Sequence, residues 1–557
     1  MRGLLAVRFS WPQLAAITAA LFLPEAASAR QIVVALAGGD YATVAAGMGV
    51  AQAGDTVTVR AGIYHEAVSF SRSGSAAGFI TLLGQPGATL DGTGLSGQGI
   101  TIDNRNYIRV QGMTVQNFKG SGTPMGIDVE GSSSYIELRN NLVHNIENPN
   151  GNAHGIAFYG TGPTPMTHIT VQGNEIRNCR LGQSESLVLN GDIDGFVVSG
   201  NTVHDNDNIG IDFIGFEGTG PAGQDQARNG SCVGNVVYNI SSAANPTYGG
   251  DRSADGIYVD GGRDIVIERN KVDNCDIGIE VACEHGGQAV SNVTVRNNFI
   301  SRGYQGDILM GGYNASRGSA NNVTVVNNTT CRATYGEVQL QYNCHGIVIK
   351  NNILYAASGQ PYISVSGSNN TSVQVGNNVY FGAGSSPGDF PDALAHFVNP
   401  LLVAPYLDLH ILPGSPAINT GLALGNDAQG QPISGLTDID GNGRIQGSAI
   451  NIGAHELASG TLAVDGPGGQ PLRLASSGTL NQPAMELDLP ATSFVEAGLY
   501  DVAGRRVVVL ANGLLSPGRY ALPLAGAGMT SGVYFGRAVV TSAGHVRSLA
   551  TRVVVLR

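Results

Sequence analysis

Short runs of alternating apolar and polar residues recur along most of the chain, and each run contains the same polar residue. An apolar alternation leads to an asparagine and a second alternation follows it, as in ITVQGNEI around Asn174 and FVVSGNTV around Asn201. The other positions of this ladder asparagine are Asn141, Asn235, Asn270, Asn298, Asn328, Asn352 and Asn378. A period of two predicts β-strands rather than helices. Because neighbouring copies lie 24 to 35 residues apart, the pattern predicts a solenoid of stacked coils.

The ladder asparagine is accompanied by a second strand in each coil. An asparagine at the same tight turn of every coil can bond the backbone of the next coil and tolerates a left-handed conformation, so we expect an asparagine ladder. The second strand has the phrase Gly-Ile-X-apolar, for instance GIDF at Gly210 and GIYV at Gly256. Further copies begin at Gly126, Gly155 and Gly278, and weaker ones at Ser186, Asp307 and Glu337. Since successive side chains of a strand alternate, X faces outward.

Two segments near the start of the chain resemble a known family. Residues 40–66 (DYATVAAGMGVAQAGDTVTVRAGIYHE) and 79–92 (FITLLGQPGATLDG) are similar to the opening of bacterial right-handed β-helix proteins of the pectate-lyase-like superfamily. The resemblance covers roughly residues 31–456. It implies an all-β fold, a right-handed parallel β-helix solenoid whose open N-terminal end is covered by a short amphipathic helix. It is specific for the fold and says little about activity.

Export is predicted from the first residues. Residues 1–29 contain Arg2 and Arg8, an apolar stretch and a small-residue cleavage site at Ala27-Ser28-Ala29, as in a signal peptide. The later residues contain no apolar stretch of the length needed to span a membrane, so we expect a mature chain that is secreted or held at the cell surface. The remaining chain divides into a β-helix with capping and closing segments over 30–456, a Gly-, Ser- and Pro-rich linker over 457–471, and a last domain over 472–557.

The last domain is predicted from three short alternating stretches, LYDVAGRRVVVL, LSPGRYALPL and SGVYFGRAVV, which are separated by Gly and Pro turns. They resemble a small Ig-like β-sandwich, similar to hook-capping modules and to type IX secretion sorting domains. The resemblance implies cell-surface anchoring, with the secretion machinery as a partner. A plain stabilising sandwich is the alternative.

Charge and cysteine content narrow the ligands. The 42 acidic against 30 basic residues give a net charge of −12, which argues against nucleic acid and favours cations. The six cysteines show no metal-ligand spacing, and both disulfides and isolated buried thiols are left open. The motif DIDGNG, with Asp438, Asp440 and Asn442, is similar to a calcium loop, but Ala449 stands where the twelfth-position Glu belongs, so a structural turn is the alternative.

Candidate chemistry gathers where the second strands carry polar outward residues. Coils stack about 4.8 Å apart, so Asp212, Tyr258 and Glu280 should form one row along the solenoid. The coil of Asp212 is also followed by two long loops, residues 214–230 and 241–255. Long loops in an economical solenoid are typical of the walls of a binding groove.

The candidate roles follow from side-chain chemistry. Carboxylate oxygens suit calcium, so Asp212, Asp260 and Glu280 are the predicted ligands of a bound Ca²⁺. The predicted catalytic residues are Asp212, Arg252, Tyr258, Glu280 and His285. The predicted substrate-binding residues are His154, Tyr159, Glu217, Arg228 and Asp255.

These residues favour an extracellular enzyme that acts on an acidic polysaccharide, with a lyase ahead of a glycoside hydrolase. Elimination on a uronate needs a base and a group that neutralises the carboxylate, whereas hydrolysis needs a pair of carboxyls. Parts of the similar superfamily use lysine as base, yet this chain has only Lys119, Lys271 and Lys350. A non-catalytic carbohydrate-binding or adhesion protein is the alternative from another class.

Overall fold

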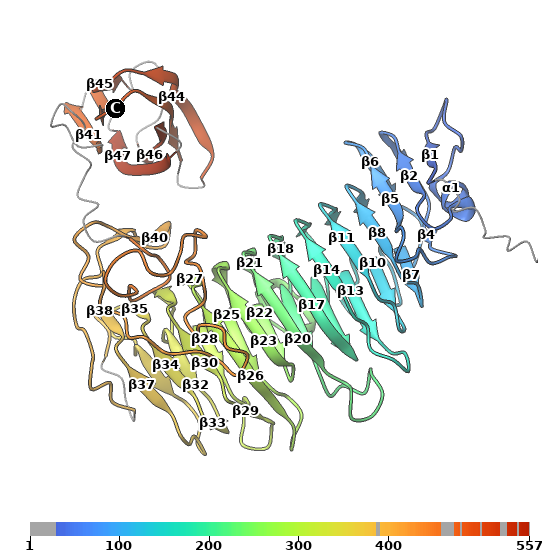
Figure 1. The fold of residues 1–557 in the computed structure, drawn as a ribbon, viewed down its shortest axis with the longest axis horizontal. Helices are drawn as coiled ribbons and strands as arrows, with labels where there is room; N and C mark the ends of the chain where they lie inside the picture. The colour runs from blue at the N-terminus through green and yellow to red at the C-terminus, as the bar shows by residue number, and fades with distance from the viewer. Residues whose placement is uncertain are drawn as a thin grey trace, which may run out of the picture.

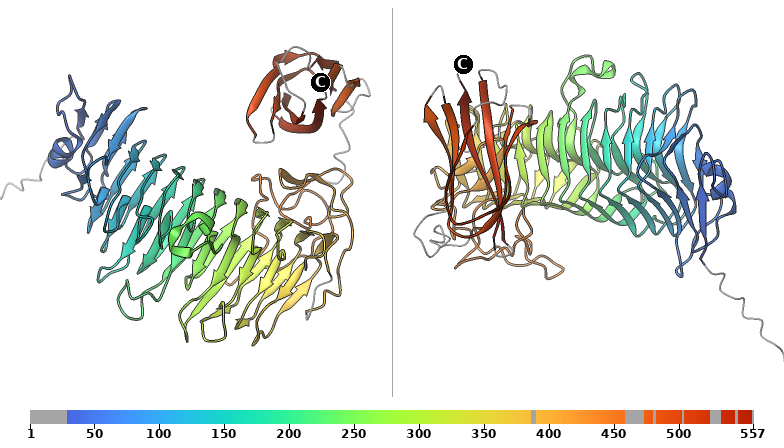
Figure 2. Two further views of the ribbon diagram at one scale, coloured as in Figure 1. Left: turned by 180° about the vertical axis from the view of Figure 1, so that it is seen from behind. Right: turned by 90° about the horizontal axis from the view of Figure 1, so that it is seen from above.

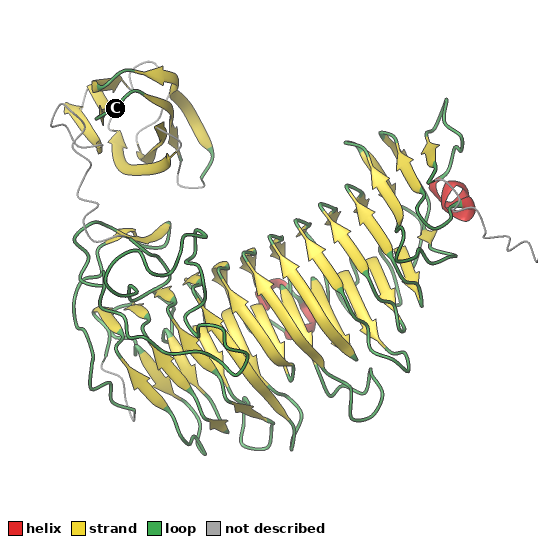
Figure 3. Ribbon diagram, in the orientation of Figure 1, coloured by secondary structure: helices red, strands yellow, loops and turns green. Residues whose placement is uncertain are grey.

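The computed structural model describes residues 29–385, 390–457, 473–479, 482–501, 504–523, 532–542 and 545–555. Up to residue 382 the chain winds as a solenoid of three parallel sheets, which we name A, B and C (Figure 1). Each coil contributes one strand to each sheet over most of the solenoid, and nearly every residue in a regular element lies in a strand (Figure 3). The sequence prediction of a parallel β-solenoid is therefore confirmed.

The strands of the solenoid are short and pair in register with the coils before and after them. Sheet A contains β1 (Gln31–Val34), β2 (Thr56–Val59), β5 (Ile80–Gly84), β8 (Ile108–Gln111), β11 (Ile136–Arg139), β14 (Ile169–Gln172), β17 (Ile193–Ser199), β20 (Ala227–Val233), β23 (Arg263–Glu268), β26 (Ala289–Arg296), β29 (Ser319–Asn321), β30 (Thr324–Val326), β33 (Cys344–His345), β34 (Val348–Lys350) and β37 (Gln374–Gly376). Sheet B contains β3 (Gly62–Tyr64), β6 (Ala88–Asp91), β9 (Thr114–Gln116), β12 (Leu142–His144), β15 (Glu175–Arg177), β18 (Thr202–Asn206), β21 (Val236–Ile240), β24 (Lys271–Cys275), β27 (Phe299–Ser301), β31 (Thr329–Cys331), β35 (Ile353–Ala356) and β38 (Val379–Gly382). Sheet C contains β4 (Val68–Ser69), β7 (Gln98–Asp103), β10 (Met125–Glu130), β13 (His154–Gly160), β16 (Leu187–Gly191), β19 (Ile211–Ile214), β22 (Asp255–Asp260), β25 (Ile277–Ala282), β28 (Gly306–Met310), β32 (Val338–Leu340) and β36 (Ile363–Val365).

The ladder asparagines form one continuous buried hydrogen-bond chain. From Asn174 to Asn378, the Oδ1 atom of each accepts the backbone N–H of the ladder asparagine one coil earlier, at 2.9 to 3.1 Å. The predicted ladder is confirmed. The left-handed backbone lies one residue earlier than predicted, for example at Asn297, where φ is 56°, because the turn must point the asparagine side chain along the solenoid axis.

The core of the solenoid is filled by the inward residues of all three sheets, among them Leu82, Ile127, Phe158 and Val259. All six cysteines are buried and free. Of the two alternatives, disulfides and isolated buried thiols, the structure therefore shows isolated thiols. A short helix, α1 (Val44–Val50), packs Val44 and Met48 into the first coils. That it serves as the N-terminal cap remains a prediction.

The closing segment, residues 390–457, contains the hairpin β39 (Leu402–Ala404) and β40 (Asp408–Ile411) and otherwise irregular chain. It lies against the last coils of the solenoid. One contact between them is the hydrogen bond of 3.0 Å from Asn327 Nδ2 to the backbone oxygen of Asn451. A buried ion pair of 3.1 Å between Arg444 and Glu456 holds its end. Figure 2 shows this segment beside the sheet ends, and a loop near residues 241–254 that projects from the solenoid.

The C-terminal residues form two antiparallel sheets. One contains β41 (Arg473–Thr479), β42 (Gln482–Leu489) and β45 (Gly518–Pro523); the other contains β44 (Arg506–Leu515), β43 (Ser493–Tyr500), β46 (Gly532–Ser542) and β47 (His545–Val555). Met485, Leu487, Val495 and Leu499 share a second buried core. Whether this body is an Ig-like sorting domain remains a prediction. The bounds of the four predicted segments, 1–29, 30–456, 457–471 and 472–557, also remain predictions. The signal-peptide and linker predictions fall almost wholly outside the described residues. Among the described residues, no helix has the length and hydropathy needed to cross a membrane.

Candidate functional site on the outer face of sheet C

Asp212, Tyr258 and Glu280 occupy matching positions on β19, β22 and β25, so the predicted row exists. The register continues to Ala157 and Asp128 on β13 and β10. We call Asp128, Asp212, Tyr258 and Glu280 the outer row. These side chains face away from the core, yet their residues are only 2 to 8% exposed. The row is therefore a set of desolvated polar groups rather than a solvated acidic surface.

Asp255 and Glu280 form a carboxyl pair on neighbouring coils. Both carboxyls are buried, and each influences the pKa of the other. Burial, followed by the charge of Glu280, raises the pKa of Asp255 well above the usual range. Burial raises the pKa of Glu280 to about 7. The ionisation of one carboxyl therefore disfavours the ionisation of the other, and the two titrate as a coupled pair.

Asp212 lies in a strongly negative environment. Burial is the main cause that raises its pKa well above the usual range, and Glu185, Asp260 and Glu217 add to the shift. The pKa of Asp260 is raised in the same way, by burial and then by Glu284, although its Oδ1 accepts the backbone N–H of Glu284 at 3.0 Å. Asp212 therefore retains its proton at a pH where an exposed aspartate is charged.

Several buried polar atoms on this face have no hydrogen-bond partner among the described residues. They are Asp128 Oδ1, Asn190 Oδ1, Asp212 Oδ1 and Asp255 Oδ1. Each unsatisfied buried group costs about 1–3 kcal/mol of folding free energy. Because they lie on four strands of sheet C, β10, β16, β19 and β22, they indicate an extended site for a hydrogen-bonding ligand.

Tyr159, His154 and Glu185 form a second polar group on the same face. The Tyr159 hydroxyl lies 2.8 Å from His154 Nε2, and His154 Nδ1 lies 3.3 Å from Glu185 Oε2. The residue His154 is 2% exposed, so its ring is fixed between the two partners. Burial, then the charges of Glu185 and Glu217, raise the pKa of Tyr159, which keeps its hydroxyl protonated.

The structure groups the potential metal ligands differently from the sequence prediction. Glu217, Asp260 and His285 place one ligand atom each within 4.8 Å of one another, whereas the predicted set combined Asp260 with Asp212 and Glu280. Glu217 also accepts a hydrogen bond of 2.8 Å from Asn190 Nδ2. A set with an imidazole nitrogen suits zinc or manganese better than calcium, which prefers oxygen ligands.

The two predicted arginines have other partners. Arg228 is buried against Asp192 and Asp194, at 2.7 and 3.2 Å, so its guanidinium is occupied and not presented to a substrate. Arg252 lies 4.6 Å from the centre of the Tyr304 ring and lines a separate cavity of about 700 Å³. The alternation rule places side chains on a face but gives no information on long arginine side chains at the corners between sheets.

Sequence reasoning missed Glu185, Glu284 and the Asp255–Glu280 contact. Glu185 precedes the weak phrase at Ser186, and Glu284 follows β25 in a turn, so neither falls on a repeat position. The paired carboxyls share no sequence motif. Their signal is the spacing of one coil, which becomes specific only once the register between β22 and β25 is known.

Comparisons with known proteins agree with this architecture. A family model described as a right handed beta helix region matches residues 231–388. The uncharacterized protein YwoF of Bacillus subtilis (strain 168) is 38% identical over 357 residues, which cover 61% of this chain and 76% of YwoF. Among solved structures, pectate lyase Pel9A matches with a TM-score of 0.43 and 15% identity over 77% of this chain and 96% of that one. An alginate lyase from Paenibacillus sp. str. FPU-7 matches with a TM-score of 0.37 and 15% identity over 64% and 99% of the two chains. The chain is thus a right-handed β-helix protein that belongs to the family of Bacillus subtilis YwoF.

Proposed function

We propose that this protein is an extracellular enzyme that cleaves a polysaccharide by hydrolysis, with carboxyl groups on the outer face of sheet C as acid and base. The observation that carries the proposal is the buried Asp255–Glu280 pair, in which burial raises the pKa of Glu280 to about 7. A catalytic acid or base works best when its pKa lies near the working pH. A buried pair of this kind has no evident structural need, because it costs folding free energy.

An extended sugar polymer is the substrate class that suits the face. Unpartnered polar atoms on four strands between β10 and β22, in a sheet whose neighbouring strands lie about 4.8 Å apart, match a long ligand with many hydroxyl groups. Tyr159 and Tyr258 add aromatic side chains beside them. A small ligand would leave most of these atoms unpaired.

In the proposed reaction, Asp212 is the general acid and Glu280 the general base. Asp212, whose pKa is raised well above that of an exposed aspartate, donates its proton to the glycosidic oxygen, while the Glu280 carboxylate takes a proton from the attacking water. The two residues lie two coils apart, which separates their Cα atoms by about 10 Å. A carboxyl separation of about 6.5–9.5 Å leaves room for a water molecule and gives inversion at the anomeric carbon, whereas about 5–5.5 Å gives retention; we propose inversion.

Elimination on a uronate, the leading prediction from the sequence, is the second candidate. It is favoured by the Glu217, Asp260 and His285 group, which could hold a divalent ion that neutralises a substrate carboxylate when bound. The His154–Tyr159 contact offers a route for the abstracted proton. We place it second because Arg228 and Arg252, the two predicted cationic groups, are engaged elsewhere.

The test is an assay of the new chain ends. Neutral and acidic polysaccharides are incubated with the full chain, with chelator or with added metal, and reducing ends and unsaturated uronates are measured in the same samples. Hydrolysis predicts reducing ends without unsaturated uronates, insensitive to chelation. Unsaturated uronates that form without chelator and not with it would show a lyase instead. Binding of the polysaccharide without new chain ends would show a non-catalytic binding or adhesion protein.

Localisation and anchoring are part of the proposal. We place the enzyme outside the cell, with residues 1–29 as signal peptide and 472–557 as the contact with the cell surface or secretion machinery. A strain producing a chain that ends at residue 471 should release it into the medium. Equal surface retention of the full and shortened chains would contradict the anchoring role.

A further inference from the structure

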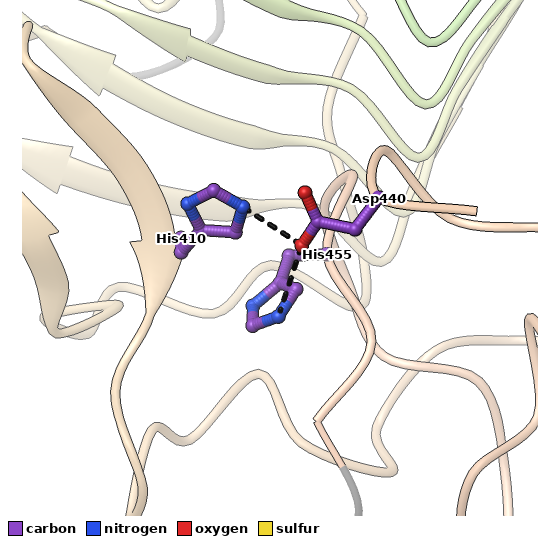
Figure 4. A group of neighbouring side chains, drawn as sticks. All are labelled: His410, Asp440 and His455. Carbon is purple, nitrogen blue, oxygen red and sulfur yellow. Dashed lines mark hydrogen bonds and ion pairs between the residues drawn. The ribbon is translucent and has the colours of Figure 1, made fainter. Parts of the chain in front are cut away.

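Three side chains of the closing segment converge away from sheet C. His410 on β40, Asp440 in the turn 438–443 and His455 each place one nitrogen or oxygen atom within 4.8 Å of the others (Figure 4). His410 Nε2 lies 2.9 Å and His455 Nε2 lies 3.9 Å from Asp440 Oδ2. The side chains are 24, 38 and 12% exposed for His410, Asp440 and His455, so the group is sheltered but open on one side.

The turn that carries Asp440 is built by Asp438. Asp438 Oδ1 accepts the backbone N–H groups of Asp440 and Asn442, at 3.0 and 2.8 Å, and its Oδ2 accepts that of Glu456 at 2.9 Å. Both oxygens of Asp438 are thus used by the backbone, which favours the structural turn over the calcium loop as the interpretation of DIDGNG. The turn leaves the Asp440 carboxylate directed at the two histidines.

The ring of His410 is held in a fixed orientation. Its Nδ1 is hydrogen-bonded to Asp408 Oδ1, and its plane meets the Phe299 ring at 88° with the centroids 4.9 Å apart. A carboxylate behind one ring nitrogen is the arrangement that orients a metal-binding histidine and increases its basicity. It leaves Nε2 as the atom that faces Asp440.

We infer that His410, Asp440 and His455 form a binding site for a divalent transition-metal ion, separate from the outer face of sheet C. Two imidazole nitrogens and one carboxylate oxygen are donors that zinc accepts, whereas calcium and magnesium take oxygen ligands. Three protein ligands leave further coordination positions for water. The ion would join β40 to the turn and to the end of the closing segment.

One contact limits the affinity. The backbone N–H of Ile411 points to His455 Nδ1 at 3.3 Å, so without an ion the ring proton resides on Nε2. Binding moves that proton to Nδ1 and releases this long contact. The site therefore binds zinc more weakly than one whose two histidines are both oriented by carboxylates.

Zinc titration of the chelator-stripped full chain tests the inference, with calorimetry for affinity and elemental analysis for the number of bound ions. We expect Asp440→Asn to lose one zinc per chain and Asp408→Asn, which leaves all three ligands, to bind zinc about 10–100-fold more weakly. Calcium should not compete.

The matched control is His285→Ala, which alters the Glu217, Asp260 and His285 group instead. It should keep the zinc that Asp440→Asn loses. The inference is overturned if the parent binds no zinc, if calcium displaces the ion, or if zinc is lost in His285→Ala and retained in Asp440→Asn; the three side chains are then a hydrogen-bonded ion-pair cluster. None of these outcomes depends on cleavage of a polysaccharide.

Discussion

The hydroxyl of Tyr159 lies 2.8 Å from Nε2 of His154, and both side chains belong to β13 on the outer face of sheet C. Glu185 lies 3.3 Å behind the ring, at Nδ1. A carboxylate, an imidazole and a phenol in this order can pass a proton from the hydroxyl to the ring while the carboxylate stabilises the imidazolium. The group neighbours the carboxyls of the outer row, so it can act on the same ligand.

Replacing Tyr159 with phenylalanine tests this relationship. If the protein acts by elimination, the second candidate function, kcat should fall about 10²–10⁴-fold, the usual contribution of a positioned proton-transfer group, with little change in thermal stability. Tyr107→Phe is the matched control, because Tyr107 stacks on Tyr135 at the outside of sheet A. Full activity of Tyr159→Phe would show that the hydroxyl only fills space.

The pH dependence of activity should follow the Asp255–Glu280 pair. Glu280 must be ionised to act as base, so kcat/KM should rise with pH up to an apparent pKa near 7, the value to which burial raises Glu280. The measurement is kcat/KM as a function of pH, and its rising part on the acidic side, the acidic limb, gives this apparent pKa. A limb that remains near pH 4.5, the value of an exposed glutamate, would contradict the assignment of Glu280.

A second buried carboxyl pair makes folding stability depend on pH. Glu337 and Asp307 are both buried and each influences the pKa of the other, and the two oxygens of Asp307 accept the backbone N–H groups of Gly303 and Cys331. Burial raises the pKa of Asp307 to about 7 and that of Glu337 well above the usual range. Between about pH 4 and 7 the unfolded chain has released these protons and the folded chain retains them, so the free energy of unfolding falls as pH rises.

The variant Glu337→Gln keeps the shape and the donor of the protonated acid. We expect its melting temperature to change less between pH 4.5 and 7.5 than that of the parent, and to exceed the parent by on the order of a few degrees at pH 7.5. Differential scanning calorimetry at several pH values measures both. A parallel shift of parent and variant across this range would contradict the role of the pair.

The asparagine ladder should be costly to interrupt at its centre. Asn235 accepts the backbone N–H and side-chain N–H of Asn201 and donates to the backbone oxygen of Val198. Asn235→Ala leaves these buried groups unpaired, so the free energy of unfolding should fall by roughly 2–5 kcal/mol. The control Gln374→Ala, which breaks one exposed bond to Lys350, should change it by less than about 0.5 kcal/mol. Equal melting temperatures for the two variants would contradict the account.

The sequence predicts the features that repeat and misses those that do not. The ladder and the row of Asp212, Tyr258 and Glu280 follow from strand alternation and a constant register, both visible as spacing. The row was expected at the surface, whereas the structure buries it, because alternation gives the direction of a side chain and no information on what covers it.

The contacts of non-repeating segments lie beyond such reasoning. His410, Asp440 and His455 come together because the closing segment folds back over the last coils, and no periodicity encodes that path. Arg228 was expected in a long loop, whereas the structure places it on β20, in register with Asp194 of β17 one coil earlier.

The most direct test of the proposed function is to compare the rates at which the parent and the Glu280→Gln variant cleave a polysaccharide. The parent, Glu280→Gln and the control Glu175→Gln, whose carboxyl lies half-exposed on sheet B, are compared on the polysaccharide that the parent cleaves. The account predicts that the parent and Glu175→Gln release new chain ends at similar rates while Glu280→Gln, folded to the same melting temperature or higher, is slower by about 10²-fold or more. A parent that cleaves no polysaccharide, or a Glu280→Gln variant as fast as the parent, would contradict it.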